Sequence, residues 1–192
     1  MRGKRLLAAA YALDVAFGDP PWLPHPVACI GAVAERGEDV VRRIIRHAPG
    51  FELVAGGLLS AGVVAGTFFL TRMSLRLARA RDPRAGTAVA LVLSASTLAT
   101  RSLVEHANAV LAPLEDGDLE AARVALARMV GRDTVDLDEG EIARALVECL
   151  AESACDGIVA PLFYLAVGGA PLAVAYKAVS YTHLTLPTIL RV

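Results

Sequence analysis

The sequence predicts an all-α, polytopic integral membrane protein with a helical polar region between its spans. Hydrophobic residues make up 55% of the 192 residues, above the roughly 45–50% of soluble chains, and the mean hydropathy is +0.51. The charged residues are concentrated in some segments and almost absent from others. Soluble helices interleave polar residues throughout their length, so this alternation is typical of a membrane protein.

The clearest predicted span is 53–70, eighteen residues without a charge, which is roughly the length that crosses the hydrocarbon core. Its small residues, among them Gly62 and Gly66, would allow a neighbouring helix to approach closely. A second span is predicted over 85–100. The shorter apolar segment 6–17 is expected to form a helix that inserts only partly.

A third span is predicted over 158–176, interrupted by Pro161, by Gly168 and Gly169, and by Pro171. Such residues survive inside membrane helices when neighbouring groups satisfy the freed backbone.

Between the second and third spans lies a polar region, 102–157. Asp118 is expected to cap a short helix that stops at Gly131. A second helix is expected to begin at Asp138, with Glu141 completing a capping box, and to run to Asp156, where Gly157 would terminate it.

The orientation in the membrane stays open at this stage. Five arginines in 72–84 form a short basic segment that the positive-inside rule places in the cytoplasm. If 85–100 then crosses fully, the polar region would face outward. Either the segment 85–100 is re-entrant, or the basic segment 72–84 is a misleading guide to the orientation.

The helix after Asp138 carries an acidic stripe on one face: Glu141, Glu148, Glu152 and Asp156. Like charges four residues apart each disfavour a helix by about 0.2–0.5 kcal/mol, so the stripe needs compensation. Magnesium, which prefers hard oxygen ligands, or arginines from elsewhere would supply it. A solvated acidic face on a surface helix is the equally weighted alternative.

Just upstream, Gly131 is followed by Arg132, Asp133 and Thr134. An arginine, a carboxylate and a hydroxyl in such a turn suit contact with an anion or with a metal-bound phosphate. An ordinary helix-terminating loop is the simpler interpretation and is favoured by the residues alone.

Two further groups could bind substrate. A proline-rich segment near the N-terminus presents Asp19 and His25, although it could equally be a helix connector at the headgroup level. At the predicted end of the second span, Arg101 and His106 lie close together, and ionisable groups at membrane depth are functional candidates.

Several function classes are excluded. With 19 basic and 20 acidic residues, the charge balance does not favour a nucleic-acid partner. The nucleotide-binding patterns GxxxxGK[ST] and GxGxxG, the zinc-protease pattern HExxH and the esterase pattern GxSxG do not occur. The three cysteines, Cys29, Cys149 and Cys155, form no CxxC pair and are expected to be reduced thiols.

The chain resembles the CobD/CbiB family of adenosylcobinamide-phosphate synthases over about residues 10–180. The resemblance rests on phrases that occur in the family's order: GDPPWLPHPV (18–27), TRSL (100–103) with His106-Ala107, VGRDT (130–134), LDE (137–139) with Glu148 and Glu152, DGIVAPLFY (156–164) and YKAVS (176–180). Each phrase is moderately specific by itself, and together in register they are strong.

The resemblance implies a membrane-bound ligase in the cell (inner) membrane. It would join aminopropanol, usually as its phosphate, to a propionate carboxylate of adenosylcobyric acid, giving adenosylcobinamide phosphate or adenosylcobinamide. Forming an amide from a free carboxylate is uphill in water, so ATP with Mg²⁺, acting through an acyl phosphate, is the expected route.

The resemblance also guides the expected residue roles. We hypothesise that one set positions magnesium and phosphate groups, with the last three as metal ligands: Arg132, Asp133, Glu148, Glu152 and Asp156. A second set is expected to contact substrate or shuttle protons: Asp19, His25, Arg101, His106 and Lys177.

The sequence departs from the family after Ser180. Residues 181–192 match neither the family nor the preceding composition and are predicted to be a non-native tail, which leaves 1–180 as a membrane domain incomplete at its C-terminus. Two alternatives to the synthase remain: a corrinoid-binding or transport subunit without catalysis, and an inactive fragment of the synthase.

Overall fold

The structure, a computed structural model, describes residues 3–18, 26–45 and 51–185, and every regular element in these ranges is helical. The helices are α1 (Gly3–Phe17), α2 (Pro26–Ile45), α3 (Glu52–Arg81), α4 (Pro83–Ala95), α5 (Thr100–Glu115), α6 (Leu119–Ala127), α7 (Glu139–Ala154) and α8 (Ala160–Thr185), and a π-helical turn, η1 (Cys155–Val159), joins α7 to α8. The all-α prediction is confirmed.

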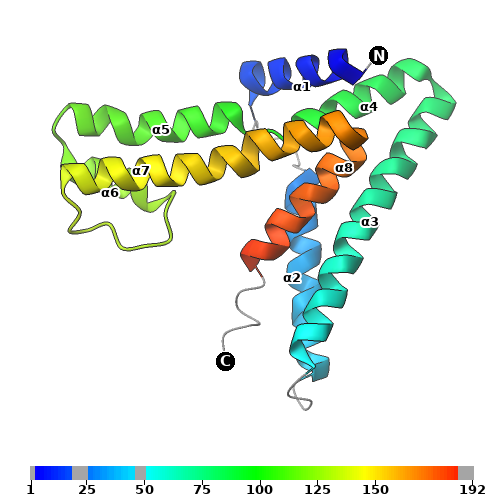
Figure 1. Ribbon diagram of the computed structural model, residues 1–192, viewed down its shortest axis with the longest axis horizontal. Helices are drawn as coiled ribbons and strands as arrows, with labels where there is room; N and C mark the ends of the chain where they lie inside the picture. Colours follow the sequence, from blue (N-terminus) through cyan, green and yellow to red (C-terminus); the bar gives the residue numbers. More distant parts are fainter. Residues whose placement is uncertain (1–2, 19–25, 46–50, 186–192) are drawn as a thin grey trace.

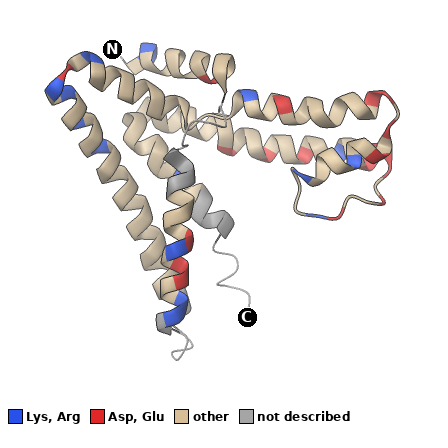
Figure 2. Ribbon diagram, turned by 180° about the vertical axis from the view of Figure 1, so that it is seen from behind, with Lys and Arg blue, Asp and Glu red and all other residues tan. Residues whose placement is uncertain are grey.

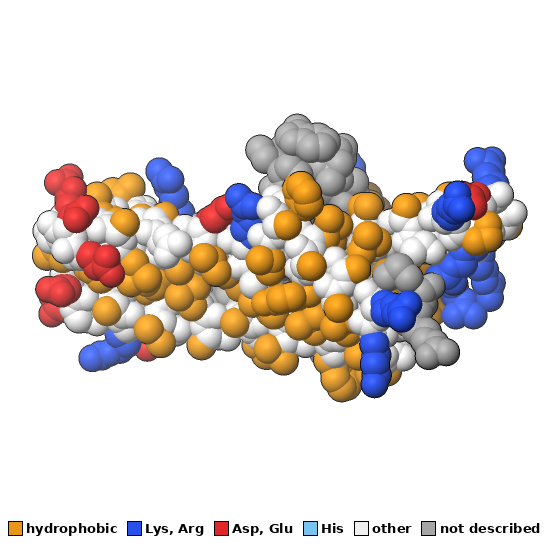
Figure 3. Space-filling view, turned by 90° about the horizontal axis from the view of Figure 1, so that it is seen from above, with side chains coloured by type: hydrophobic (Ala, Val, Ile, Leu, Met, Phe, Trp, Pro, Cys, Tyr) orange, Lys and Arg blue, Asp and Glu red, His pale blue; other side chains and the backbone are white. Residues whose placement is uncertain are grey.

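The helices form two groups (Figure 1). Helices α2, α3 and α8 pack together as a membrane bundle, and α5, α6 and α7 form a polar arm that extends away from it. Helices α1 and α4 lie where the two groups meet. Charged residues gather on the polar arm, on the second half of α2 and at the end of α3, whereas most of α3 and α8 is uncharged (Figure 2). From above, an apolar middle separates charged ends (Figure 3).

Among the described residues, three helical segments are long and apolar enough to cross a membrane: Val54–Arg81, Pro83–Glu115 and Glu139–Ser180. The predicted span 53–70 lies within α3, but α3 continues to Arg81. Its 30 residues extend about 45 Å, well beyond the roughly 30 Å hydrocarbon core. The basic segment is therefore mainly the last turns of α3, not a loop.

The second predicted span, 85–100, is not one continuous helix. Helix α4 ends at Ala95, and α5 begins at Thr100. The Thr97 hydroxyl donates to the Ser94 carbonyl at 2.7 Å, a local bond that competes with helix continuation. The 13 residues of α4 extend only about 20 Å, too short to cross by themselves, which favours the re-entrant alternative.

The third predicted span is a broken helix, as expected. The break is at Gly169, whose φ of 69° and ψ of −166° lie in a region that is open essentially to glycine alone. It turns the second half of α8 back across the bundle, where Val174 and Ala178 pack with Ile30 of α2 and Val63 of α3.

The prediction that Gly157 ends the α7 helix is wrong, because the chain continues through η1 into α8. The Gly157 carbonyl accepts a hydrogen bond from the Ala99 amide at 3.0 Å. A Cβ at Gly157 would lie 3.3 Å from the Cβ of Ala99. Glycine is present here because two backbones approach closely, a requirement that local pattern does not reveal.

The polar arm has its own core, formed by six side chains from three helices: Val110, Ala122, Leu126, Ile142, Ala145 and Leu146. The Asp118 side chain caps α6 as predicted, accepting from the Ala121 amide at 2.9 Å. However, α6 ends at Ala127 rather than near Gly131, since the last turn tightens and the Met129 amide bonds to the Leu126 carbonyl.

The capping box of α7 is present in both directions. The Glu141 amide donates to Asp138 Oδ1 at 2.8 Å, and the Asp138 amide donates to Glu141 Oε2 at 2.9 Å. Glu141 is thereby occupied in capping the helix.

Replacing Asp138 with alanine is expected to destabilise the first turn of α7 by about 1 kcal/mol, because two backbone amides lose their capping geometry. Hydrogen exchange of the amides of 140–142 should quicken by about fivefold. Asp136→Ala is the matched control, since Asp136 is exposed and lies just outside the helix. Equal exchange in the two variants would contradict the capping role.

Sequence patterns did not predict α2. Its first half packs on α3, while its second half carries five charged residues, including the ion pair of Arg42 with Glu38 at 2.7 Å. The charged residues of α2 remove any span signal, and its amphipathic pattern was the signal that could have predicted the helix.

Candidate functional site

The predicted site residues separate into two clusters. The first is a hollow on the polar arm, of about 290 Å³, between α7 and the loop that follows α6. Arg132 enters it from the loop, and Glu148 and Glu152 enter it from α7. Arg132 Nη2 lies 3.2 Å from Glu148 Oε2, with the two side chains 52% and 59% exposed. An ion pair this exposed contributes little stability, so both groups remain available to a ligand.

Hydrogen bonds that involve Arg123 of α6 fix the loop from Gly131 to Thr134. The Thr134 side chain is buried, and its hydroxyl donates to the Arg123 carbonyl at 3.0 Å. Arg123 Nε in turn donates to the Leu137 carbonyl at 2.8 Å. Asp133 Oδ1 accepts from the Val135 amide at 3.1 Å, which closes an Asx turn. Of the loop residues, Gly131 and Arg132 line the hollow, while Thr134 and Asp133 hold the loop in position.

The hollow fits a magnesium-bound phosphate better than a bare metal ion. In the part of the chain that the structure describes, no three His, Cys, Asp or Glu side chains cluster to hold a metal. Glu148 and Glu152 supply two carboxylates one helical turn apart, beside the guanidinium of Arg132. Magnesium is commonly held by one or two carboxylates, with waters and phosphate oxygens completing its shell.

Asp156, the last residue of the predicted stripe, belongs to the second cluster. It lies in η1 and is bonded from the returning half of α8. Its Oδ1 accepts from the Tyr176 hydroxyl at 2.7 Å and its Oδ2 from the Ser180 hydroxyl at 3.4 Å. The Lys177 ammonium donates to the backbone carbonyl of Asp156 at 3.2 Å. The ring of Tyr176 stacks on Tyr164 with centroids 4.7 Å apart.

This second cluster adjoins the start of α5. Asp14 of α1 is only 3% exposed, and its Oδ2 accepts from the Thr100 amide at 2.8 Å, which caps α5 from a distant helix. The Thr100 hydroxyl is buried without a hydrogen-bond partner among the described residues. Since the Ala99 amide bonds to Gly157, three separate segments meet within a few residues.

The α5 candidates lie on the exposed side of this junction. Arg101 Nη1 donates to the Ala16 carbonyl at 2.5 Å, and its Nε pairs with Glu105 at 2.7 Å. The left-handed Gly18 packs against Arg101, where a Cβ would lie 2.8 Å from the arginine Cδ. His106 is exposed, and its Nδ1 lies 2.6 Å from the Ser102 carbonyl. Arg101 therefore anchors the end of α1.

Asp19 and His25 lie outside the described residues, so their predicted roles stay predictions. Cys149 and Cys155 are free thiols, in agreement with the prediction for those two.

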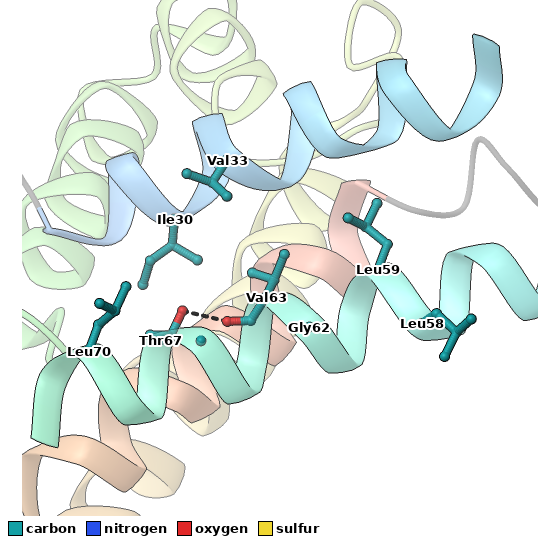
Figure 4. A pocket seen from close by; sticks show the side chains of 9 residues that line it. Ile30, Val33, Leu58, Leu59, Gly62, Val63, Thr67 and Leu70 are labelled. Atoms are coloured by element: carbon teal, nitrogen blue, oxygen red, sulfur yellow. Dashed lines mark hydrogen bonds between the residues drawn. The ribbon is translucent and has the colours of Figure 1, made fainter. Parts of the chain in front are cut away.

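A hollow of about 500 Å³ between α2 and α3 is of a different kind (Figure 4). Its lining is apolar, including Ile30, Val63 and Leu70, with Gly62 at its floor. The Thr67 hydroxyl is used within its own helix, donating to the Val63 carbonyl at 2.7 Å. With no free polar group, this surface suits apolar contact in a membrane rather than chemistry.

Sequence reasoning missed Thr100, Tyr176 and Ser180 as site residues. One available signal was the pair Tyr176 and Ser180, two polar side chains four residues apart in an apolar segment, which must share a helix face. The capping contact of Asp14 with Thr100 joins positions 86 residues apart and left no local signal.

Comparison with known proteins gives a consistent result. A family model described as "CobD/Cbib protein" matches residues 7–183. The chain is 46% identical over 175 residues to the "Cobalamin biosynthesis protein CobD" of Pelobacter propionicus, which covers 91% of this chain and 53% of that protein. It is 44% identical to the CobD of Klebsiella pneumoniae over 89% of this chain and 53% of that protein.

A third relative, the "Cobalamin biosynthesis protein CbiB" of Salmonella choleraesuis, is 43% identical over 173 residues, 89% of this chain and 53% of that protein. The chain thus spans about half the length of the curated relatives it matches. No solved structure matches it.

Proposed function

Because this chain belongs to the CobD/CbiB family, we propose that its parent protein is a membrane-bound amide synthase of cobalamin biosynthesis. The observation that carries the proposal is the convergence of the family's phrases in space. The VGRDT phrase forms a hollow with Glu148 and Glu152, and the DGIVAPLFY and YKAVS phrases meet at Asp156. Phrases far apart in sequence would not converge on polar side chains if their role were only to pack.

The proposed reaction joins the amine of aminopropanol, or of its phosphate, to a propionate carboxylate of adenosylcobyric acid. The carboxylate attacks the γ-phosphorus of ATP, forming an acyl phosphate and releasing ADP. The amine nitrogen then attacks the acyl carbon, the C–O bond to phosphate breaks, and inorganic phosphate leaves. The amine loses one proton overall, which a base or water must accept.

The hollow on the polar arm suits the phosphate part of this reaction. The Arg132 guanidinium would bind phosphate oxygens, and Glu148 and Glu152 would hold Mg²⁺, which neutralises charge on the transferred phosphoryl group. Asp133 and Thr134 keep the Arg132 backbone in place through the contacts described above. Arg101 and His106 lie at the exposed side of the junction, where a corrinoid carboxylate could reach them.

The apolar α3 and α8 support a membrane location, for which we propose the inner cell membrane. A transport or corrinoid-binding role is the second candidate, favoured by the break in α8 at Gly169, since interrupted helices line transport paths. The folded polar arm, with its own core and its two-carboxylate hollow, favours catalysis instead.

Complementation tests the proposal. The full-length gene, extended to family length, and the 192-residue chain would be expressed separately in a bacterium that lacks its own synthase and is fed cobyric acid. Growth that requires cobalamin is expected with the full-length gene. Failure of a well-expressed, membrane-inserted full-length protein to support growth would overturn the synthase proposal and favour the transport role.

A further inference from the structure

We propose that the Asp156 carboxylate, with the hydroxyls of Tyr176 and Ser180, is the binding site for the primary ammonium group of the amine substrate. The inference rests on the proposed function and deepens it, because it separates an amine subsite at η1 from the phosphate hollow on the polar arm.

The acceptor geometry matches an ammonium group. Tyr176 and Ser180 each donate one hydrogen bond to Asp156, at 2.7 and 3.4 Å, from one face of α8. A carboxylate offers about four lone-pair positions, so at least two remain open, and each hydroxyl oxygen keeps its own acceptor capacity. The three N–H groups of an ammonium can therefore be met by the carboxylate and the two hydroxyl oxygens.

The charges around Asp156 also favour an ammonium ligand. The two side chains that donate to the Asp156 carboxylate are uncharged hydroxyls, and the Lys177 ammonium bonds to the backbone carbonyl of that residue. The residue is half-buried within the third candidate membrane segment. A half-buried carboxylate is costly unless it is paired, and a substrate cation would supply the partner.

The backbone is shaped to present this carboxylate. The π-helical turn inserts an extra residue between α7 and α8, and such turns are frequent at functional sites. The break at Gly169 then returns Tyr176 and Ser180 to the same point. The Asp156 carboxylate is contacted by two hydroxyls, whereas the hollow sets two carboxylates beside a guanidinium that can hold a magnesium-bound phosphate, so an ammonium is the better-matched cation at Asp156.

The two subsites are close enough to cooperate. Glu152 of the hollow and Asp156 differ by four residues, about 6 Å along the helix axis. An ammonium held at Asp156 would give one proton to the Asp156 carboxylate, and the resulting neutral amine would attack the carboxyl group that is activated at the neighbouring hollow.

The test is steady-state kinetics of the full-length protein in lipid nanodiscs, with each substrate varied in turn. Asp156→Asn keeps the side-chain shape and removes the charge, so the KM for the amine should rise roughly tenfold to a hundredfold. The KM for the corrinoid should not change. Propanediol, or its phosphate, lacks the amine and should inhibit the wild type and Asp156→Asn equally. Val159→Ala is the matched control, because Val159 is an exposed residue of the same π-helical turn.

Two milder variants keep the test decisive if Asp156→Asn does not insert. Tyr176→Phe and Ser180→Ala each remove one hydroxyl and should raise the amine KM by roughly threefold to tenfold, again without changing the corrinoid KM. An unchanged amine KM, or equal changes for both substrates, would overturn the amine subsite while leaving the synthase proposal in place. A wild-type protein that forms no amide would instead overturn the synthase proposal itself.

Discussion

Replacing both Glu148 and Glu152 with alanine is expected to lower amide synthesis by roughly a hundredfold or more in the full-length protein. These are the two carboxylates that line the Arg132 hollow, and their removal leaves the guanidinium without a counter-charge and the site without hard oxygen ligands. Corrinoid binding should be retained, since the loss concerns phosphate chemistry. Synthesis would be followed by chromatography of the corrinoid product, and binding by quenching of intrinsic fluorescence.

Helix α6 offers a control for this double variant. Glu120 is an exposed carboxylate in the first turn of α6, away from the hollow, and Glu120→Ala should leave synthesis unchanged. If the double variant retained full synthesis, the assignment of the hollow to phosphate and magnesium would be wrong. If it lost corrinoid binding as well, the hollow would be a corrinoid site instead.

Replacing Gly169 with alanine is expected to destabilise the protein by about 1–3 kcal/mol and to reduce synthesis strongly. The φ of 69° and ψ of −166° at this position are essentially closed to residues with a Cβ. Relief of that strain would straighten α8 and carry Tyr176 and Ser180 away from Asp156. Thermal unfolding in detergent and the amine KM would be measured together.

Gly57→Ala is the matched control, because Gly57 lies inside α3 with open space around its Cβ position. That change should be neutral or slightly stabilising, since alanine is the better helix former. A Gly169→Ala protein with the unfolding temperature and amine KM of the wild type would show that the break in α8 is not needed to assemble the Asp156 cluster.

Several features of this protein could be predicted from neighbouring residues alone. The uncharged run 53–70, the caps at Asp118 and Asp138, and the interruption of the third span near Gly169 were all predicted and are present. Each depends on hydrophobic period, on capping side chains or on glycine and proline, all of which act within a few residues. Three of the four carboxylates of the acidic stripe lie on α7 as predicted, whereas Asp156 lies in η1.

The partners of that stripe could not be predicted in the same way. Three of its four carboxylates take different roles: Glu141 caps α7, Glu148 faces Arg132, and Asp156 meets Tyr176. Equal spacing along a helix implies one face but does not reveal what packs against each turn of it. The misplaced helix end at Gly157 has the same origin, because a close backbone approach and a helix terminus both select glycine.

The sequence by itself determined the helical class, the apolar spans and the candidate carboxylates, because composition and short-range periodicity govern all three. Only the tertiary structure decided that Asp14 caps α5 and that the returning half of α8 encloses Asp156. Those contacts join residues 86 and 20 positions apart, and they depend on how whole helices turn back on one another. The break at Gly169 sets that return, and its direction is a property of backbone geometry that no local pattern specifies.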